Sequence, residues 1–125
     1  MKPSSFVLFY VKSPAASAAF YEKLLGLKPV EQSPGFAMFV MPGDFKLGLW
    51  LDTAIDPPAS GKVGGAEIMF DCETDADVDA AHADWAAKGA AILQKPTMME
   101  FGYTFTATDS DGHRLRVYRR AENPV

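Results

Sequence analysis

The sequence predicts an α+β protein built from two βαβββ modules. Apolar and aromatic runs typical of buried strands recur along the chain, two helical segments separate them, and each helical segment ends at a glycine. The order of elements therefore repeats once, with modules at 4–51 and 64–119 and a linker at 52–63. Because 125 residues is the length of one ordinary domain, we expect the two modules to form a single domain at 1–125.

The first module begins with a strand predicted at 5–11, where SFVLFYV is rich in β-branched and aromatic residues. A helix is predicted over 14–25, because Ser13 suits the cap and Pro14 suits the first helical position. Gly26 is expected to end it in a left-handed conformation. The residues at near-helical spacing on its apolar side are Ala18, Phe20 or Tyr21, Leu24 and Leu25.

Three short strands complete the first module, at 28–33, 36–41 and 44–51. SPG and PGD supply tight turns between them. The stretch that follows, DTAIDPPASGKVGG, holds two adjacent prolines and three glycines. We expect no regular element in it.

The second module repeats this order. It has a strand at 66–72, a helix at 75–88 that Thr74 or Asp75 caps and Gly89 ends, and three strands in AAILQKP, FGYTFTATD and HRLRVYR. Residue identity between the modules is poor, so the repeat rests on element order and glycine placement. The matching positions are Val7 with Ile68, Phe9 with Phe70 and Gly26 with Gly89.

Composition argues against several kinds of partner. The net charge is −4 and the 12 basic residues are dispersed, so we expect no nucleic-acid partner. No apolar run approaches the roughly 20 residues that span a bilayer, and the N-terminus is not a convincing signal peptide. The single Cys72 excludes an internal disulfide framework and fits a reducing compartment. We therefore expect a cytoplasmic protein without a membrane partner.

Several segments carry a family resemblance. The βαβββ repeat, FYEKLLGLKPV at 20–30 and DSDGHRLRVY near the end resemble the vicinal oxygen chelate superfamily over about 5–119. That superfamily includes glyoxalase I, extradiol dioxygenases and bleomycin-binding resistance proteins, so the resemblance specifies the fold better than the function. FKLGLW (45–50), FGYTFTATDSDGH (101–113) and RVY (116–118) look most like the small phenazine-binding antibiotic resistance proteins.

The resemblance also implies where metal-using members place their ligands. These positions fall on Phe6, near Gly48, on Glu67 and on Arg116. Phenylalanine and glycine have no donor, and the permanent cation of Arg116 would repel a divalent metal. Only Glu67 remains, whereas divalent metals want three or more convergent donors. We therefore predict no metal, no cofactor and no catalytic residue.

The stretch TDSDGHRLRVY (108–118) first suggests a metal or acid–base site. We interpret it as a hairpin turn in which Asp109 and Asp111 bond the local backbone and Gly112 takes a positive φ. His113 is expected to be a bystander at the start of the last strand. His82 is expected to face solvent or the helix side of the sheet.

Successive side chains of a strand point to opposite faces of a sheet. If Phe6 points away from the helices, this alternation decides which other strand side chains do the same. The helix-side sets are apolar, and we expect the other sets to line the concave cleft of a curved mixed sheet with the helices outside. Gly48 is expected to leave room beside Trp50, and Arg116 to bind a carboxylate. The predicted ligand-binding residues are Phe6, Leu8, Tyr10, Gly48, Trp50, Glu67, Met69, Tyr103, Arg116 and Tyr118.

Alternatives remain for several of these residues. Trp50 could fill the groove or a dimer contact, and Glu67 and Arg116 could form an internal ion pair. Met98, Met99 and Phe101 are expected in the core, with a lid or an interface as the alternative.

The leading hypothesis is a metal-free protein that sequesters a flat aromatic, antibiotic-like ligand of the phenazine type and so confers resistance. The resemblance implies a homodimer with two equivalent sites. One alternative is a metal-dependent lyase or dioxygenase of the same superfamily, with Glu67 and His113 as ligands. Another is a metal-free enzyme with Glu67 or Tyr10 as general base. A third is a structural module with a filled groove.

Overall fold

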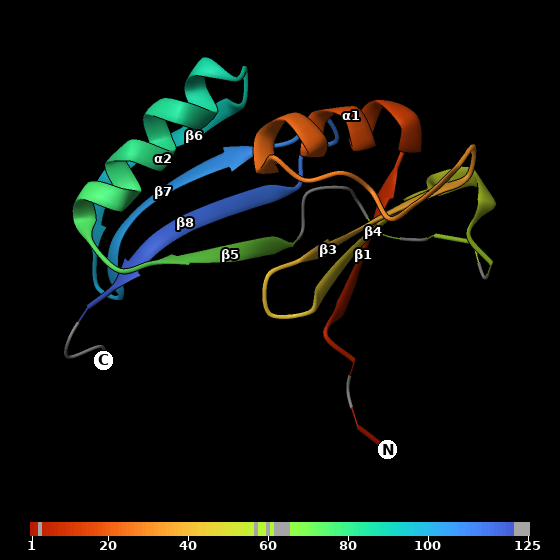
Figure 1. Ribbon diagram of the computed structural model, residues 1–125, viewed down its shortest axis with the longest axis horizontal. Coiled ribbons are helices and arrows are strands. Elements are labelled where there is room, and N and C mark those ends of the chain that lie inside the picture. The colour runs from red at the N-terminus through yellow and green to blue at the C-terminus, as the bar shows by residue number, and fades with distance from the viewer. Residues whose placement is uncertain (3, 57, 60, 62–65, 122–125) are drawn as a thin grey trace. The chain divides into compact units, whose positions relative to one another are not determined.

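The computed structural model describes residues 1–2, 4–56, 58–59, 61 and 66–121 (Figure 1). Along these residues the elements are β1 (Phe6–Val11), α1 (Pro14–Leu25), β2 (Glu31–Ser33), β3 (Phe36–Met41), β4 (Phe45–Leu51), η1 (Asp52–Ala54), β5 (Glu67–Cys72), α2 (Asp75–Ala87), β6 (Ala91–Met99), β7 (Gly102–Thr108) and β8 (Arg114–Arg120). The order is that of two βαβββ modules, as predicted.

The chain divides into two compact units, Met1–Val63 and Gly64–Val125. Each unit has one four-stranded mixed sheet, with the strand orders β1-β4-β3-β2 and β5-β8-β7-β6. In each unit the helix lies against one face of the sheet (Figure 1). The α+β class is thereby confirmed. That the modules at 4–51 and 64–119 make up a single domain stays a prediction.

In the first unit, β1 runs parallel to β4, and β3 and β2 add antiparallel strands. The Ser13 hydroxyl accepts a hydrogen bond from the Ala16 amide at 3.1 Å, and Gly26 ends α1 with φ 70°. Both helix boundaries therefore lie where the capping residues predict them. Tyr21 is fully buried beside Phe39, which decides between Phe20 and Tyr21 as the core residue.

The second unit is built in the same way, with β5 parallel to β8 and then β7 and β6 antiparallel. Thr74 and Asp77 form a capping box at the start of α2, which settles Thr74 rather than Asp75 as the cap. Trp85 packs edge-to-face on Phe70 and Phe105 at 5.5 Å. This cluster fixes α2 on one face of the sheet and leaves the other face open.

The predicted alternation is confirmed in both sheets. Leu47, Leu49, Leu115 and Val117 lie on the helix sides and are at most 2% exposed. On the opposite faces, Leu8, Tyr10 and Met69 are 42–49% exposed. The two open faces therefore carry the side chains that sequence alternation assigns to them.

Two segments differ from expectation. β2 begins at Glu31 rather than at 28, since Pro29 has no N–H to donate to a strand ladder. A short 3-10 helix occupies 52–54, where we expected no regular element. Of the predicted linker, 57, 60, 62 and 63 lie outside the described residues. The helices in the described part of the chain are too short or too polar to cross a membrane.

Candidate functional site

The open face of the second sheet carries a hollow of about 510 Å³. A volume of this order suits a small organic ligand. Its walls come from β5, β8 and the turn between β6 and β7, and all of them belong to the second unit. The lining residues are Glu67, Met69, Phe101, Arg116, Tyr118 and Arg120.

Arg116 lies at the polar end of this hollow and is engaged on both edges of its guanidinium. Its Nε donates to Glu67 Oε2 at 3.1 Å and its Nη2 to Glu67 Oε1 at 3.2 Å. Its Nη1 donates to Gln94 Oε1 at 3.0 Å and lies 3.5 Å from Thr104 Oγ1. The internal ion pair, one of the two alternatives for these residues, is therefore the arrangement that forms. The edge that would bind a ligand carboxylate in pairs is occupied.

Gln94 and two buried threonines complete this polar floor. Thr106 Oγ1 donates to Gln94 Oε1 at 3.2 Å, and Thr104 Oγ1 donates to the Val117 carbonyl at 2.8 Å. Among the described residues, every buried side-chain nitrogen and oxygen has a hydrogen-bond partner. A floor with its hydrogen bonds satisfied is a rigid support that needs no ligand to complete it.

Sequence reasoning missed Gln94, Thr104 and Thr106, and it placed Tyr103 with the ligand-binding set. The structure puts Tyr103 on the helix side, where its hydroxyl donates to Asp79 Oδ1 of α2 at 2.7 Å. That hydrogen bond raises the pKa of Tyr103, with smaller contributions from burial and the nearby acids. Buried Phe105 carried the missing signal, since Tyr103 shares its face two positions earlier.

The apolar wall is formed by Met69, Phe101 and Tyr118. The rings of Phe101 and Tyr118 lie edge to face with centroids 6.1 Å apart, and the Arg116 guanidinium carbon stands 5.6 Å from the Phe101 centroid. The core expectation for Phe101, Met98 and Met99 is wrong. Met98 and Met99 end β6 and are exposed, and Phe101, in the turn that follows, is half-buried.

The first sheet has an open face of its own, with Phe6, Leu8, Tyr10 and Trp50. The space above Gly48 is filled rather than open. A Cβ there would stand 2.5 Å from Leu8 Cδ2, with Phe6 and Phe36 ring carbons at 3.0 and 3.1 Å. Gly48 therefore lets neighbouring side chains cross the strand, and it does not provide room for a ring beside Trp50. Ligand binding by this face stays a prediction.

The turn at 108–113 is held by one buried carboxylate. Asp109 Oδ1 accepts from the amides of Asp111 and His113 at 2.9 Å each, and Oδ2 lies 2.8 Å from His113 Nδ1. Gly112 has the predicted positive φ, at 90°. His113 is 5% exposed and acts in the structure as a fixed partner of Asp109, not as a bystander.

His82 and Cys72, the two remaining candidate residues, lie outside the hollow. His82 packs its ring on Phe105 on the helix side of the second sheet, as expected. Cys72 is half-buried, and burial, with Asp77 and Asp71 as smaller causes, raises the pKa of its thiol. A raised pKa keeps the thiol protonated, which weakens it as a nucleophile. In the part of the chain that the structure describes, no three His, Cys, Asp or Glu side chains gather into a metal-binding group.

Residues 5–117 match the sequence profile of the Glyoxalase/Bleomycin resistance protein/Dioxygenase superfamily. The chain belongs to this superfamily. The match covers both modules, including every residue of the hollow except Tyr118 and Arg120.

Several known proteins resemble the chain to different degrees. The phenazine antibiotic resistance protein EhpR of Enterobacter agglomerans is 28% identical over 113 residues, 88% of this chain and 86% of EhpR. The solution structure of protein ATC0852 from Agrobacterium tumefaciens has 52% identity and a TM-score of 0.87, over 97% of this chain and 99% of that one. A glyoxalase-related enzyme from Fulvimarina pelagi has a TM-score of 0.83 at 20% identity, over 96% and 89% of the two chains, which shows a shared fold.

Within the superfamily fold, two of the implied metal-ligand positions come together in the second unit. They are Glu67 and Arg116, and the geometry makes them partners of each other. Pairing neutralises the Glu67 carboxylate and leaves a permanent cation beside it. This arrangement can support a ligand that lies on the hollow, but it is poorly suited to hold a divalent metal.

Proposed function

We propose that the protein is a metal-free binding protein that sequesters a planar aromatic molecule of the phenazine type. The hollow on the open face of the second sheet is the proposed ring-binding surface. The observation that carries the proposal is the composition of this hollow, in which Met69, Phe101 and Tyr118 form an apolar wall beside a satisfied ion pair. The similarity to EhpR, named as a phenazine resistance protein, supports the same ligand class.

The physical basis of binding is contact between flat apolar surfaces. A fused aromatic ring laid on Met69 and Tyr118 removes apolar area from water, and each square ångström contributes about 25 cal/mol. Stacking or edge contact with Phe101 adds about 0.5–1.5 kcal/mol beyond the buried area. Since Met69 is 49% exposed, its side chain has surface left to bury.

The Glu67–Arg116 pair favours binding over metal chemistry. A metal-dependent lyase or dioxygenase would use Glu67 as a ligand, but both its oxygens accept from Arg116. Releasing Glu67 would leave Arg116, whose side chain is 13% exposed, without its counter-charge. The same engagement opposes a metal-free enzyme with Glu67 as general base.

The proposal extends to assembly and location. By its resemblance to small superfamily members, we infer a homodimer with one site per subunit. Light scattering on a purified sample checks this, and a mass of about one chain contradicts it. We also place the protein in the cytoplasm, where the unpaired Cys72 would stay reduced.

Isothermal titration of the purified protein with phenazine tests the proposed function. We expect saturable binding at one site per chain. Met69→Ala should weaken it about three- to ten-fold, because that variant removes part of the wall. Met98→Ala is the matched control, since Met98 is 58% exposed and does not line the hollow.

Two results of this titration would count against the proposal. One is heat indistinguishable from that of buffer, which would show that the protein does not bind phenazine. The other is an equal loss of phenazine affinity in Met69→Ala and Met98→Ala, which would show that the hollow is not the binding site. In a phenazine-sensitive bacterium, expression of the wild-type protein should raise the tolerated phenazine concentration, and Met69→Ala should raise it less.

A further inference from the structure

Arg120 is the last residue of β8 and differs from the other arginines of that strand. Arg116 is held by Glu67 and Gln94, Arg114 lies 3.8 Å from Glu67, and Arg119 on the helix side pairs with Asp75. The guanidinium of Arg120 has no hydrogen bond or ion pair with any residue that the structure describes. Arg120 is exposed and lines the hollow. It is therefore the cation of β8 that a ligand could bind without displacing a carboxylate.

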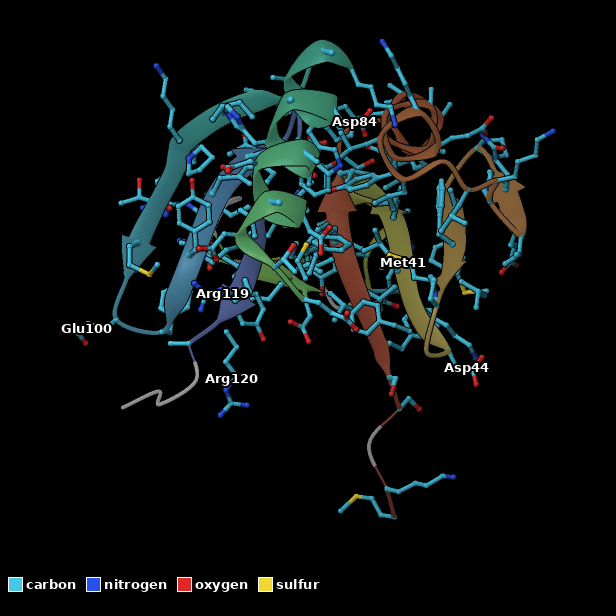
Figure 2. All side chains as sticks on the ribbon, turned by 60° about the vertical axis from the view of Figure 1, so that its left-hand side comes forward. Met41, Asp44, Asp84, Glu100, Arg119 and Arg120 are labelled. Carbon is cyan, nitrogen blue, oxygen red and sulfur yellow. The ribbon has the colours of Figure 1, made fainter. Side chains whose placement is uncertain are left out.

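Among the residues that the structure describes, no carboxylate pairs with the Arg120 side chain. Figure 2 shows Arg119 and Arg120 near the end of β8, with the Arg120 guanidinium extending away from the strand. Glu100 lies on the neighbouring turn, but in this view it points in a different direction. Among the residues that line the hollow, the two cations Arg116 and Arg120 outnumber the one carboxylate, Glu67. The rim of the hollow is thus locally positive in a chain of net charge −4.

We propose that the bound molecule is an anion, and that Arg120 selects it by pairing with its negative group. The aromatic ring lies on the wall of Met69, Phe101 and Tyr118, and a carboxylate on the ring reaches the rim. This inference rests on the proposed function and names the substrate class of the same site. A guanidinium suits the role because its planar fork donates two parallel hydrogen bonds to a carboxylate.

Arg116 is less suited than Arg120 to bind the carboxylate of a ligand. A ligand carboxylate at Arg116 would compete with Glu67 for Nε and Nη2, which already donate at 3.1 and 3.2 Å. A carboxylate at Arg120 displaces no carboxylate among the residues that the structure describes. The two arginines therefore have different roles. Arg116 supports the floor of the hollow, and Arg120 at the rim binds the negative group of the ligand.

The test compares phenazine, which is neutral at pH 7, with phenazine-1-carboxylate, which is an anion. Affinities are measured by isothermal titration at low salt for the wild-type protein, Arg120→Gln and Arg114→Gln. Arg114→Gln is the matched control, because it removes the same charge from the same face of the same strand but lies outside the lining of the hollow.

We expect the wild-type protein to bind the carboxylate about five-fold more tightly than phenazine, the upper range for a solvent-exposed ion pair. Arg120→Gln should weaken binding of the carboxylate about five-fold more than binding of phenazine and so abolish this preference, while Arg114→Gln should keep it. Equal affinities of the wild-type protein for the two probes would overturn the inference and leave the proposed function standing. An equal loss of the preference in Arg120→Gln and Arg114→Gln would also overturn the inference, since it would indicate a long-range charge effect. If neither probe binds the wild-type protein, both proposals fall.

Discussion

Arg116 and Glu67 hold each other by two hydrogen bonds across the neighbouring strands β8 and β5, with N–O distances of 3.1 and 3.2 Å. The pair occupies two positions at which metal-using relatives are expected to carry ligands. It neutralises the carboxylate and fixes the guanidinium beneath the Phe101 ring.

Replacement of Glu67 by glutamine tests the pair. Glu67→Gln leaves a largely buried guanidinium without its counter-charge, so we expect the free energy of unfolding to fall by about 1 kcal/mol in urea denaturation. Asp71→Asn is the control on the same face of β5, and it should change stability by less than about 0.5 kcal/mol. Equal effects of the two variants would show that the pair contributes nothing specific.

The turn after β7 depends on the buried Asp109. In Asp109→Asn, an NH₂ group replaces an oxygen that accepts hydrogen bonds from the turn, so we expect a loss of about 1–3 kcal/mol in the free energy of unfolding. Ser110→Ala, an exposed change in the same turn, should have little effect. A wild-type urea midpoint for Asp109→Asn would contradict this assignment of the turn.

The Tyr103–Asp79 hydrogen bond predicts a pH effect. The carboxylate of Asp79 accepts from the Tyr103 hydroxyl and raises the pKa of that tyrosine above its ordinary value of about 10. The bond stabilises the protonated form, so its contribution is complete below pH 10 and is lost as the pH rises through the raised pKa.

Ultraviolet titration of tyrosinate absorbance measures this effect. Asp79→Asn should lower the pKa of the late-titrating tyrosine, and Tyr103→Phe should remove that transition. A titration curve unchanged by Asp79→Asn would mean that the bond does not persist in solution.

Gly102 allows the start of β7 to approach the backbone of β8 closely. It has φ 144°, and a Cβ there would stand only 1.9 Å from the Arg119 carbonyl oxygen. Gly102→Ala should therefore cost about 3 kcal/mol or more of stability in urea denaturation. Gly26→Ala is the control, because Gly26 also has a positive φ but has open space around it, and it should cost about 1–2 kcal/mol. A smaller loss for Gly102→Ala than for Gly26→Ala would refute the steric argument.

Much of the fold follows from local sequence signals. Ser13, Thr74, Gly26 and Gly89 mark helix ends through backbone chemistry that acts within a few residues. Alternation of apolar residues assigned the two faces of each sheet, because a strand that slipped by one residue would bury Arg116 under α2. The order of elements along the chain follows from the same local signals, whereas the order of strands within each sheet was not predicted.

The details of the site were harder to predict. Whether Arg116 meets a ligand or Glu67 depends on side-chain geometry across two strands, which spacing along one strand does not determine. Gln94 reaches Arg116 past an irregularity between Ile92 and Gln94 in the β6–β7 pairing, and such a shift breaks the alternation that sequence analysis relies on. Arg120 was not among the predicted ligand-binding residues, because its proposed role depends on which other arginines already have partners.

The most direct test of the central claim is to locate the ring of a bound phenazine by NMR. Intermolecular nuclear Overhauser effects from the phenazine ring protons would be recorded in protein with labelled methionine methyl groups and aromatic rings. We predict contacts to the Met69 methyl group and to the Phe101 and Tyr118 rings. Contacts confined to Tyr10 and Trp50 on the first sheet, or no contacts to a ligand shown to bind, would contradict the proposed site.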